Sequence, residues 1–542
     1  MQERSRFAIH GSKCTGMPKE SLRGHCFSSA PPSRPSASVV DLLTELTSRV
    51  NGQEIKVPSQ LLTNETEETP PRPRNGRRRR PERSLKDVAT DFCQTYLSLK
   101  QLPLAGTQQG SGCAREAIIL QLVNSCGVDF GRVSGAVSGF DEHDYATVAN
   151  LREVSTPRYL SIFHRILSEA RRDVGLSFLV DLRTDVRSYA AIVREGQPGD
   201  DVDRDATHRC RTQLKQLDRD LLALLAPLFS PTILELRRIT YDGTPASIIE
   251  KVARKEAVHP LRSLKDLRTR LGPDRRCFAF FHPSLPAEPL VFVHVALLDR
   301  IPRAMDEIGT LSAPADEATV AAFYSITSTQ PGLAGVDLGH ALLRQVVEEV
   351  RSEVPGIRTF ATLSPIPRLR QWMESVVVRN GSGGGMDVLG REGRQGLARA
   401  LGCGADDALG RLVELVGTPS WQEDDGATEA VRPFLMRIAA HYLVNEKQRQ
   451  RGDEEVGPCQ PPRPLDGVAR FHVRNGAELE GLNYLADPSR RGMRNSCGIM
   501  ANYRYRLDAI EANHVAHEVG GTMPVADSVA DWLAGQQQQE EA

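Results

Sequence analysis

The sequence predicts a two-domain protein, in which an all-helical domain is followed by an α/β domain built on a central sheet. Helical periodicity is nearly the only hydrophobic pattern up to about residue 232, whereas short strand-like runs alternate with helices after residue 233. At 542 residues the chain is also too long for one ordinary core. We therefore expect an arm or targeting leader at 1–83, a helical bundle at 84–232, an α/β domain at 233–520 and a polar tail at 521–542.

The composition narrows the class of protein. The formal net charge is -1, so the chain as a whole has no field that would attract nucleic acid, and we expect no nucleic-acid partner. Its ten cysteines form no C-x-x-C pair, which argues against a structural zinc site and is typical of a reducing compartment. No run of about 18 apolar residues occurs, so we expect no membrane span.

The first 83 residues are rich in Ser, Pro and Arg, and seven arginines lie between Arg72 and Arg83. Three interpretations are open: a disordered linker, a nucleic-acid or nuclear-import patch, or an organelle transit peptide. No aromatic residues are interleaved for base stacking. We expect a mitochondrial location, with the cytosol or peroxisome as alternatives; the terminal Glu-Glu-Ala is not a peroxisomal Ser-Lys-Leu address.

The helical domain begins at Ser84, a suitable cap for a helix with Leu85, Val88, Phe92 and Tyr96 on one face. The same periodicity predicts further helices at 114–124, 149–154, 159–169, 176–193 and 207–228. In the second domain, β-branched and aromatic runs predict strands at 277–282, 290–298, 321–328 and 359–363, and a helix at 338–354. Loops are expected at 283–289, 379–385 and 448–464.

Between the strand at 321–328 and the helix at 338–354 lies a glycine-containing turn, Gln330 to Gly339. Backbone N–H groups at such a turn, with the dipole of the following helix, favour a phosphate or pyrophosphate. A purely structural strand-to-helix turn fits the residues equally well. The binding candidates are Pro331, Gly332, Leu333, Ala334, Gly335, Val336 and Asp337.

Two further segments carry polar groups suited to chemistry. The strand at 359–363 runs into Ser-Pro-Ile-Pro, where the two-residue period places Thr362 and Ser364 on one face, although both hydroxyls could simply satisfy the turn. In Val468 to Ala477, alternation predicts a strand and an Asn-Gly hairpin turn, with His472 on a polar face between two arginines. Neighbouring positive charge would disfavour the imidazolium and leave His472 poised near neutral pH; a solvated strand face is the alternative.

Several stretches in order resemble the malonyl-CoA decarboxylase family. They are Glu256-Ala-Val-His-Pro260, Leu271-Gly-Pro-Asp-Arg-Arg-Cys277, Glu288-Pro-Leu290, Val293-His-Val-Ala-Leu297, Phe323-Tyr-Ser-Ile326, Leu363-Ser-Pro-Ile-Pro367, Phe471-His472, Asn475-Gly-Ala477 and Met500-Ala-Asn-Tyr-Arg-Tyr505. The resemblance spans about 240–506 and implies an acetyltransferase-like (GNAT) catalytic domain after a helical domain that serves oligomerisation. It also implies a homo-oligomer that binds malonyl-CoA at the glycine turn and needs no cofactor.

By the same resemblance His472 handles a proton and Tyr505 lines the site. The family motif has its catalytic serine where this chain has Ala361, so we assign that hydroxyl role to Thr362, with Ser364 as the alternative. The implied reaction converts malonyl-CoA to acetyl-CoA and carbon dioxide in fatty-acid metabolism, with the thioester as its own electron sink. An acyltransferase of the same fold and a non-catalytic regulatory relative are the competing functions.

Overall fold

A computed structural model describes residues 85–101, 110–169, 172–195, 204–261, 263–311, 313–381, 388–418, 420–448 and 461–537. The arm at 1–83, most of the two loops expected at 379–385 and 448–464, and the last five residues lie outside these ranges. Within the described part of the chain, no helix is long and apolar enough to cross a membrane.

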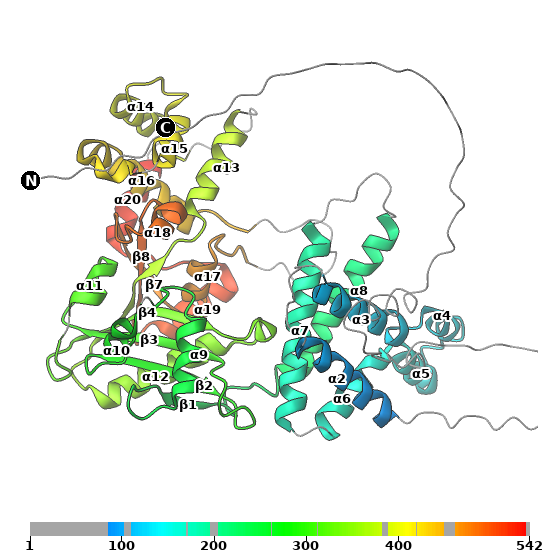
Figure 1. The fold of residues 1–542 in the computed structure, drawn as a ribbon. Coiled ribbons are helices and arrows are strands. Elements are labelled where there is room, and N and C mark those ends of the chain that lie inside the picture. Colours follow the sequence, from blue (N-terminus) through cyan, green and yellow to red (C-terminus); the bar gives the residue numbers. More distant parts are fainter. Residues whose placement is uncertain are drawn as a thin grey trace, which may run out of the picture. The chain divides into compact units, whose positions relative to one another are not determined.

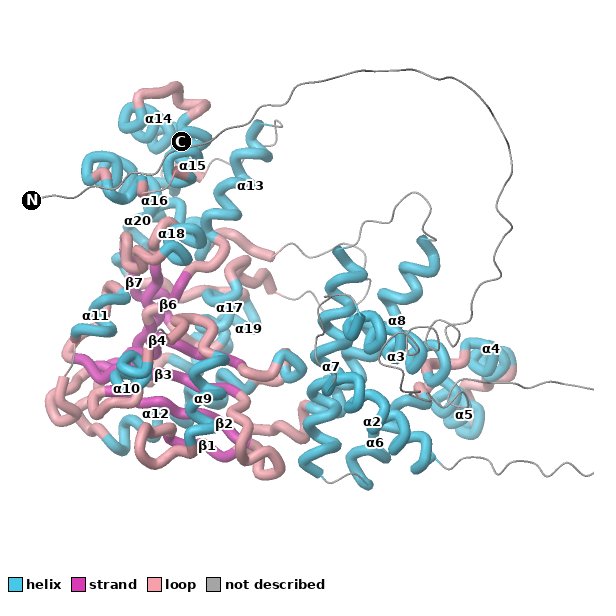
Figure 2. Tube along the Cα trace, viewed as in Figure 1, coloured by secondary structure: helices cyan, strands magenta, loops and turns pink. Residues whose placement is uncertain are grey.

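The described part of the chain before residue 230 is built of helices, as predicted, and Figures 1 and 2 show helices joined by loops in this region, without a strand. The helices are α2 (Leu85–Gln101), α3 (Gly110–Cys126), α4 (Phe130–Ser138), α5 (Tyr145–Ser155), α6 (Arg158–Glu169), α7 (Arg172–Glu195) and α8 (Arg204–Leu225). Aromatic side chains from separate helices form the core, where Tyr96 meets Phe178 edge to face at 5.2 Å. Tyr96, Phe163 and Phe178 are fully buried, so the bundle has its own apolar interior.

The second domain is built on one eight-stranded sheet, and it confirms the predicted α/β class. Its strands are β1 (Glu235–Arg238), β2 (Arg275–Phe281), β3 (Val291–Leu298), β4 (Val320–Ser328), β5 (Thr359–Thr362), β6 (Ser364–Pro365), β7 (Glu478–Asn483) and β8 (Met500–Tyr505). Strands β1 to β4 pair antiparallel, β5 joins β4 in parallel, and β8 pairs with β5, β6 and β7. The four strands predicted from the sequence are β2, β3, β4 and β5.

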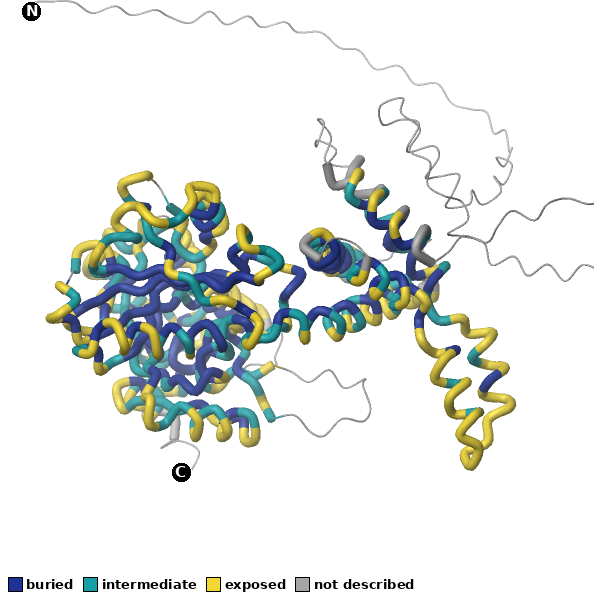
Figure 3. Tube along the Cα trace, turned by 90° about the horizontal axis from the view of Figure 1, so that it is seen from below, coloured by how far each residue is buried: buried dark blue, intermediate teal, exposed yellow. Residues whose placement is uncertain are grey.

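Helices cover both faces of this sheet. On one face Cys277 and Ala279 pack with residues of α9 (Ala246–Lys255) and α10 (Leu264–Arg270), and α11 (Met305–Thr310) joins a neighbouring cluster. Arg276 alternates with Cys277 and bonds to Glu353 of α12 (Leu338–Glu353), which places α12 on the other face. Figure 3 shows the strands buried between exposed helices and loops. The central strands are therefore apolar on both sides, which explains their continuous hydrophobic runs.

The register of β3 and β4 is irregular beside the site. His294 lies opposite Ser325 and Val295 opposite Phe323, so Tyr324 is an extra residue in β4. A bulge of this kind bends the strand and redirects its side chains. Beyond it β4 continues to Ser328 and leads into a short 3₁₀ turn, η2 (Pro331–Leu333), and then α12. The predicted strand–glycine turn–helix order is confirmed.

A further set of helices follows β6: α13 (Leu369–Gly381), α14 (Gly390–Leu401), α15 (Ala408–Gly417), η3 (Trp421–Glu423), α16 (Asp425–Val444), α17 (Gly467–Arg474), α18 (Arg490–Ser496), α19 (Ile510–Gly520) and α20 (Asp527–Gln537). Of these, α20 falls in the segment expected to be a polar tail. It packs against α16 and β7 and buries Val529 completely. Folded structure thus extends past residue 520 to at least residue 537.

The strand and hairpin predicted around His472 are wrong. Residues 467–474 form α17, because the Asp466 side chain caps the helix by accepting hydrogen bonds from the N–H groups of Val468 and Ala469. Asn475 ends the helix, and Gly476 takes a left-handed φ of 79° where a side chain would collide with the Ile510 carbonyl. His472 is therefore buried on a helix instead of exposed on a polar strand face.

Candidate active site

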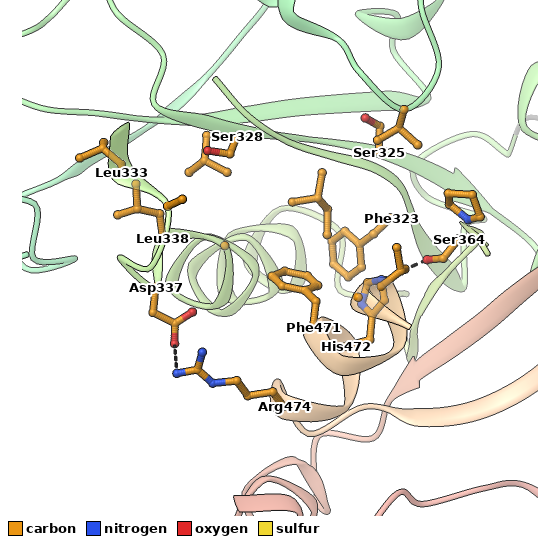
Figure 4. Close-up of a pocket in the computed structure, with 18 of the residues that line it drawn as sticks. Phe323, Ser325, Ser328, Leu333, Asp337, Leu338, Ser364, Phe471, His472 and Arg474 are labelled. Carbon is orange, nitrogen blue, oxygen red and sulfur yellow. Dashed lines mark hydrogen bonds and ion pairs between the residues drawn. The ribbon is translucent and has the colours of Figure 1, made fainter. Parts of the chain in front are cut away.

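A cavity of about 450 Å³ lies where the loop before α12, the bulged part of β4, β6 and α17 come together. Figure 4 shows Leu333, Leu338 and Asp337 at one end and Ser364 with His472 at the other, and Phe323 and Phe471 between them. Its lining residues are Val258, Val291, Phe323–Ile326, Ser328, Leu333–Gly339, Leu363–Pro365, Gly467, Val468, Phe471, His472 and Arg474. Polar groups thus lie at the two ends of a largely apolar channel.

The loop end of the cavity contains five of the seven residues predicted to bind the anion, Leu333 to Asp337. Gly335 has a φ of 93°, which lets the loop reverse direction ahead of α12. Pro331 and Gly332 do not line the cavity. Gly332 packs against α7 instead, where an added Cβ would lie 1.9 Å from the Val180 carbonyl oxygen. The close packing of the loop on the helix explains this glycine.

An ion pair stands beside the loop. The Asp337 carboxylate lies 3.4 Å from the Arg474 guanidinium, and about half of each side chain is exposed. Exposed pairs of this kind stabilise a protein by roughly 0–1 kcal/mol. Arg474 belongs to α17, two residues after His472, so the pair connects the loop to the helix that carries the histidine.

At the other end, buried polar groups form a hydrogen-bonded chain. The Ser364 hydroxyl donates to Thr362 Oγ1 at 2.9 Å, and His472 Nε2 lies 3.1 Å from Ser364 Oγ. The other ring nitrogen of His472, Nδ1, lies 2.8 Å from the Tyr505 hydroxyl. Since the Ser364 proton is directed to Thr362, Nε2–H is the donor to Ser364 Oγ. A neutral imidazole carries one N–H, so Nδ1 accepts from Tyr505.

Burial sets the protonation of this chain. It lowers the pKa of His472 to about 3, since the charged ring would lose its hydration. The imidazole is therefore neutral at physiological pH, and its pKa is well below the near-neutral value expected from the sequence. The cause also differs from the one predicted, because burial and not the neighbouring arginines lowers the pKa. Burial raises the pKa of Tyr505, so this phenol keeps its proton.

The two hydroxyls expected to share one face do so, but their surroundings differ. Ser364 lines the cavity, whereas Thr362 is fully buried behind it and accepts the Tyr503 N–H at 3.1 Å. Tyr505 does not line the cavity either and contacts the site through His472 and Phe323. Ala361 is buried in the sheet and lies outside the lining. Alanine at this position consequently removes no hydroxyl from the cavity.

Sequence reasoning missed several residues of the site. Phe323 and Phe471 form its apolar walls, and Tyr503 stacks on the His472 ring at 4.6 Å. Ser325 lines the cavity and donates to the buried Glu256 carboxylate, with 2.8 Å to each oxygen. The signal was present, because Phe471 adjoins His472 and Glu256 opens the first of the family-like stretches. Among the described residues, no group of three or more His, Cys, Asp or Glu side chains could hold a metal ion.

This arrangement suits a long, partly anionic substrate with a reactive end. The loop and the start of α12 offer backbone N–H groups to a charged portion, the aromatic walls take an extended middle, and a neutral hydroxyl–imidazole pair meets the far end. Fold and site together define an α/β enzyme that carries a helical N-terminal domain.

Comparison with known proteins resolves the family. Residues 127–229 match the model of the malonyl-CoA decarboxylase N-terminal domain, and residues 232–542 match that of the C-terminal domain. The mitochondrial malonyl-CoA decarboxylase of Anser anser anser is 33% identical over 423 residues, which are 75% of this chain and 77% of that protein. The crystal structure of malonyl-CoA decarboxylase from Rhodopseudomonas palustris is 32% identical with a TM-score of 0.66, covering 83% of this chain and 96% of that one. The structure from Agrobacterium vitis is 30% identical with a TM-score of 0.65, covering 83% and 97%. The chain belongs to the malonyl-CoA decarboxylase family.

Proposed function

We propose that this enzyme converts malonyl-CoA to acetyl-CoA and carbon dioxide in the cavity described above, as a step of fatty-acid metabolism. One observation carries the proposal: Ser364, His472 and the loop Leu333 to Asp337 line a single cavity. The coenzyme A diphosphate binds at the loop and the first turn of α12, where the helix dipole favours negative charge. The malonyl group then reaches Ser364 and His472.

The reaction breaks the bond between C2 and the carboxylate carbon of the malonyl group. The electron pair of that bond delocalises into the thioester as an enolate, so the substrate supplies its own electron sink and no cofactor is required. Protonation of C2 completes acetyl-CoA. The apolar walls of the cavity favour the loss of carbon dioxide, because a carboxylate that has lost its hydration is converted there to a neutral molecule.

We assign the roles by position in the hydrogen-bonded chain. When the substrate binds, the Ser364 hydroxyl turns its proton from Thr362 to the substrate carboxylate or the thioester oxygen, because Ser364 lines the cavity and Thr362 does not. Nε2–H of His472 is the proton donor to C2, since an enolate carbon is basic enough to take a proton from a neutral imidazole. A proton taken up from solvent restores Nε2–H after the reaction, while the Tyr505 hydroxyl keeps its own proton and holds Nδ1 at 2.8 Å. Thr362 holds Ser364 in place.

The direct test is product analysis with malonyl-CoA as the sole substrate. Release of carbon dioxide with stoichiometric acetyl-CoA, in the absence of any acyl acceptor, supports a decarboxylase and excludes a strict acyltransferase. Replacing His472 with Ala should lower kcat roughly 10²–10⁴-fold, the usual contribution of a positioned acid, while the Kd of coenzyme A changes little. His143→Ala, on a side chain that is 87% exposed, is the matched control and should behave like the wild type. An unchanged kcat for His472→Ala would refute the assigned role.

The same proposal extends to assembly and location. The enzyme forms a homo-oligomer through its helical domain, which leaves Phe130 74% and Tyr145 84% exposed on α4 and α5. Light scattering of the wild type and of Phe130→Glu tests this, because a charge in the contact should shift the mass toward the monomer. We place the enzyme in mitochondria, as the names of the Anser anser anser and Rattus norvegicus relatives support. Imaging of the tagged full-length chain tests the compartment.

A further inference from the structure

A buried arginine of the helical domain is bonded to the substrate-binding loop. Arg183 of α7 is 1% exposed, and its Nη1 donates to the carbonyl oxygens of Gly332 at 2.7 Å and Ala334 at 2.8 Å. Its Nε donates to Asp218 of α8 at 2.9 Å. One guanidinium thus connects two carbonyl groups of the loop to the Asp218 carboxylate of α8. The fork geometry of arginine allows this, and a lysine ammonium cannot reproduce it.

The bond to Ala334 has a consequence for the next residue. The Ala334 carbonyl and the Gly335 N–H belong to one planar trans peptide, so they point in opposite directions. With the carbonyl held by Arg183, the Gly335 N–H points away from that guanidinium, and Gly335 itself lines the cavity whereas Arg183 does not. In the described part of the chain this N–H has no acceptor. It is a donor available to a ligand.

The loop needs such a restraint because Gly335 has a φ of 93°, a region open to glycine in several orientations. An unrestrained peptide here could rotate and present its carbonyl oxygen to the cavity, which would repel a phosphate. We propose that Arg183 is a positioning residue for the coenzyme A diphosphate, holding the 334–335 peptide with its N–H toward the cavity. This inference rests on the proposed function, since it takes coenzyme A as the ligand of the loop.

The substrate itself offers a sharp test. Malonyl-pantetheine has the reactive end of malonyl-CoA but lacks the diphosphate, so it cannot use the Gly335 N–H. Arg183→Gln should raise KM for malonyl-CoA about tenfold to hundredfold, the effect of losing a hydrogen bond to a charged group, with kcat nearly unchanged. For malonyl-pantetheine the same variant should stay within about twofold of the wild type in kcat/KM. If Arg183 had a merely structural role, kcat/KM would fall equally for both substrates.

Two variants make the test specific. Arg187→Gln is the matched control, because Arg187 lies one turn further along α7, pairs with the same Asp218 at 3.5 Å and touches no loop carbonyl. This variant should leave kcat/KM unchanged for both substrates. Arg183→Lys keeps the charge beside Asp218 but cannot reach both carbonyls; it should give an intermediate rise in KM, and it carries the test if Arg183→Gln does not fold.

Binding measurements separate this inference from the proposed function. Calorimetric titration with coenzyme A and with pantetheine requires no catalysis. Arg183→Gln should weaken coenzyme A about tenfold to hundredfold relative to the wild type and leave pantetheine unchanged, whether or not malonyl-CoA is turned over. Equal losses for the two ligands, or no loss for either, would overturn the role of Arg183. Absence of carbon dioxide release by the wild type would instead overturn the proposed reaction alone.

Discussion

Comparing Ser364→Ala with Thr362→Val tests which of two adjacent hydroxyls does the chemistry. Ser364 lines the cavity and bonds to His472, so its removal deletes a polar contact to the substrate while disturbing little packing. Losing one such donor lowers kcat about 10²–10³-fold in enzymes that stabilise a developing anion. The unfolding free energy of Ser364→Ala should fall by about 1–3 kcal/mol, the net contribution of its two hydrogen bonds, to Thr362 and to His472.

Thr362→Val should have the opposite effect, with a large loss of stability and a small loss of kcat. Valine keeps the shape of threonine but leaves two buried donors without an acceptor, the Ser364 hydroxyl and the Tyr503 N–H. At roughly 1–3 kcal/mol for each unsatisfied group, the variant should lose about 2–6 kcal/mol of stability and keep kcat within about tenfold of the wild type. Steady-state kcat with malonyl-CoA and the urea unfolding midpoint measure the two effects. A stable Thr362→Val variant with a kcat as low as that of Ser364→Ala would refute this division of roles.

Three further outcomes follow from contacts in and around the site. Tyr505→Phe removes the donor to His472 Nδ1 and should lower kcat about tenfold to hundredfold without changing the Kd of coenzyme A; an unaltered kcat would exclude a role for Tyr505 in orienting His472. Gly332→Ala places a methyl group 1.9 Å from the Val180 carbonyl oxygen, so calorimetric melting should show a loss of about 1–3 kcal/mol, and wild-type stability would contradict the packing described. Burial lowers the pKa of His294 to about 3, so below pH 6.5 only the unfolded chain takes up this proton and stability falls as the pH falls toward 3. At pH 5 the loss is about 2 kcal/mol, and His294→Phe should lack that share of the acid destabilisation measured by urea unfolding between pH 7.5 and 5; an unchanged pH dependence would contradict it.

Regular periodicity made most of the fold predictable. The strands β2 to β5 and the helices between 85 and 225 other than α4 follow from spacing. The helix α4 was not predicted, because it buries only Ala136 and leaves Phe130 and Val137 exposed. The helix at 467–474 was not predicted, because its apolar and charged residues also alternate as in a strand. An eight-residue helix is too short for its period to exclude a strand. The decisive signal was Asp466, a helix cap whose effect depends on a backbone conformation that the pattern does not reveal.

The segments that meet at the candidate site were predictable from the sequence, but the side chains that line the cavity were not: Pro331, Gly332, Thr362 and Tyr505 lie outside the lining. Spacing placed Thr362 and Ser364 together, and they are hydrogen-bonded. Which of them faces the cavity depends on β8, because Thr362 is occupied by the Tyr503 N–H of that strand. Met500 to Tyr505 had no clear alternation of apolar and polar residues, so β8 itself was not predicted. Similarly, no local pattern brings Arg183 to the loop 149 residues later.

In the proposed reaction, the contrast between the two ends of the cavity explains how one pocket can serve a substrate with negatively charged groups at both ends, of which one keeps its charge and the other loses it. At the loop the charge persists, and backbone N–H groups near the exposed Asp337–Arg474 pair keep that region solvated. At His472 the charge of the malonyl carboxylate must disappear, and only neutral groups line that end: a hydroxyl, an uncharged imidazole and aromatic rings. A cation beside Ser364 would stabilise the reactant carboxylate more than the enolate, in which the charge has moved to the thioester oxygen. A neutral histidine avoids that loss of rate, since only interactions stronger in the transition state accelerate the reaction.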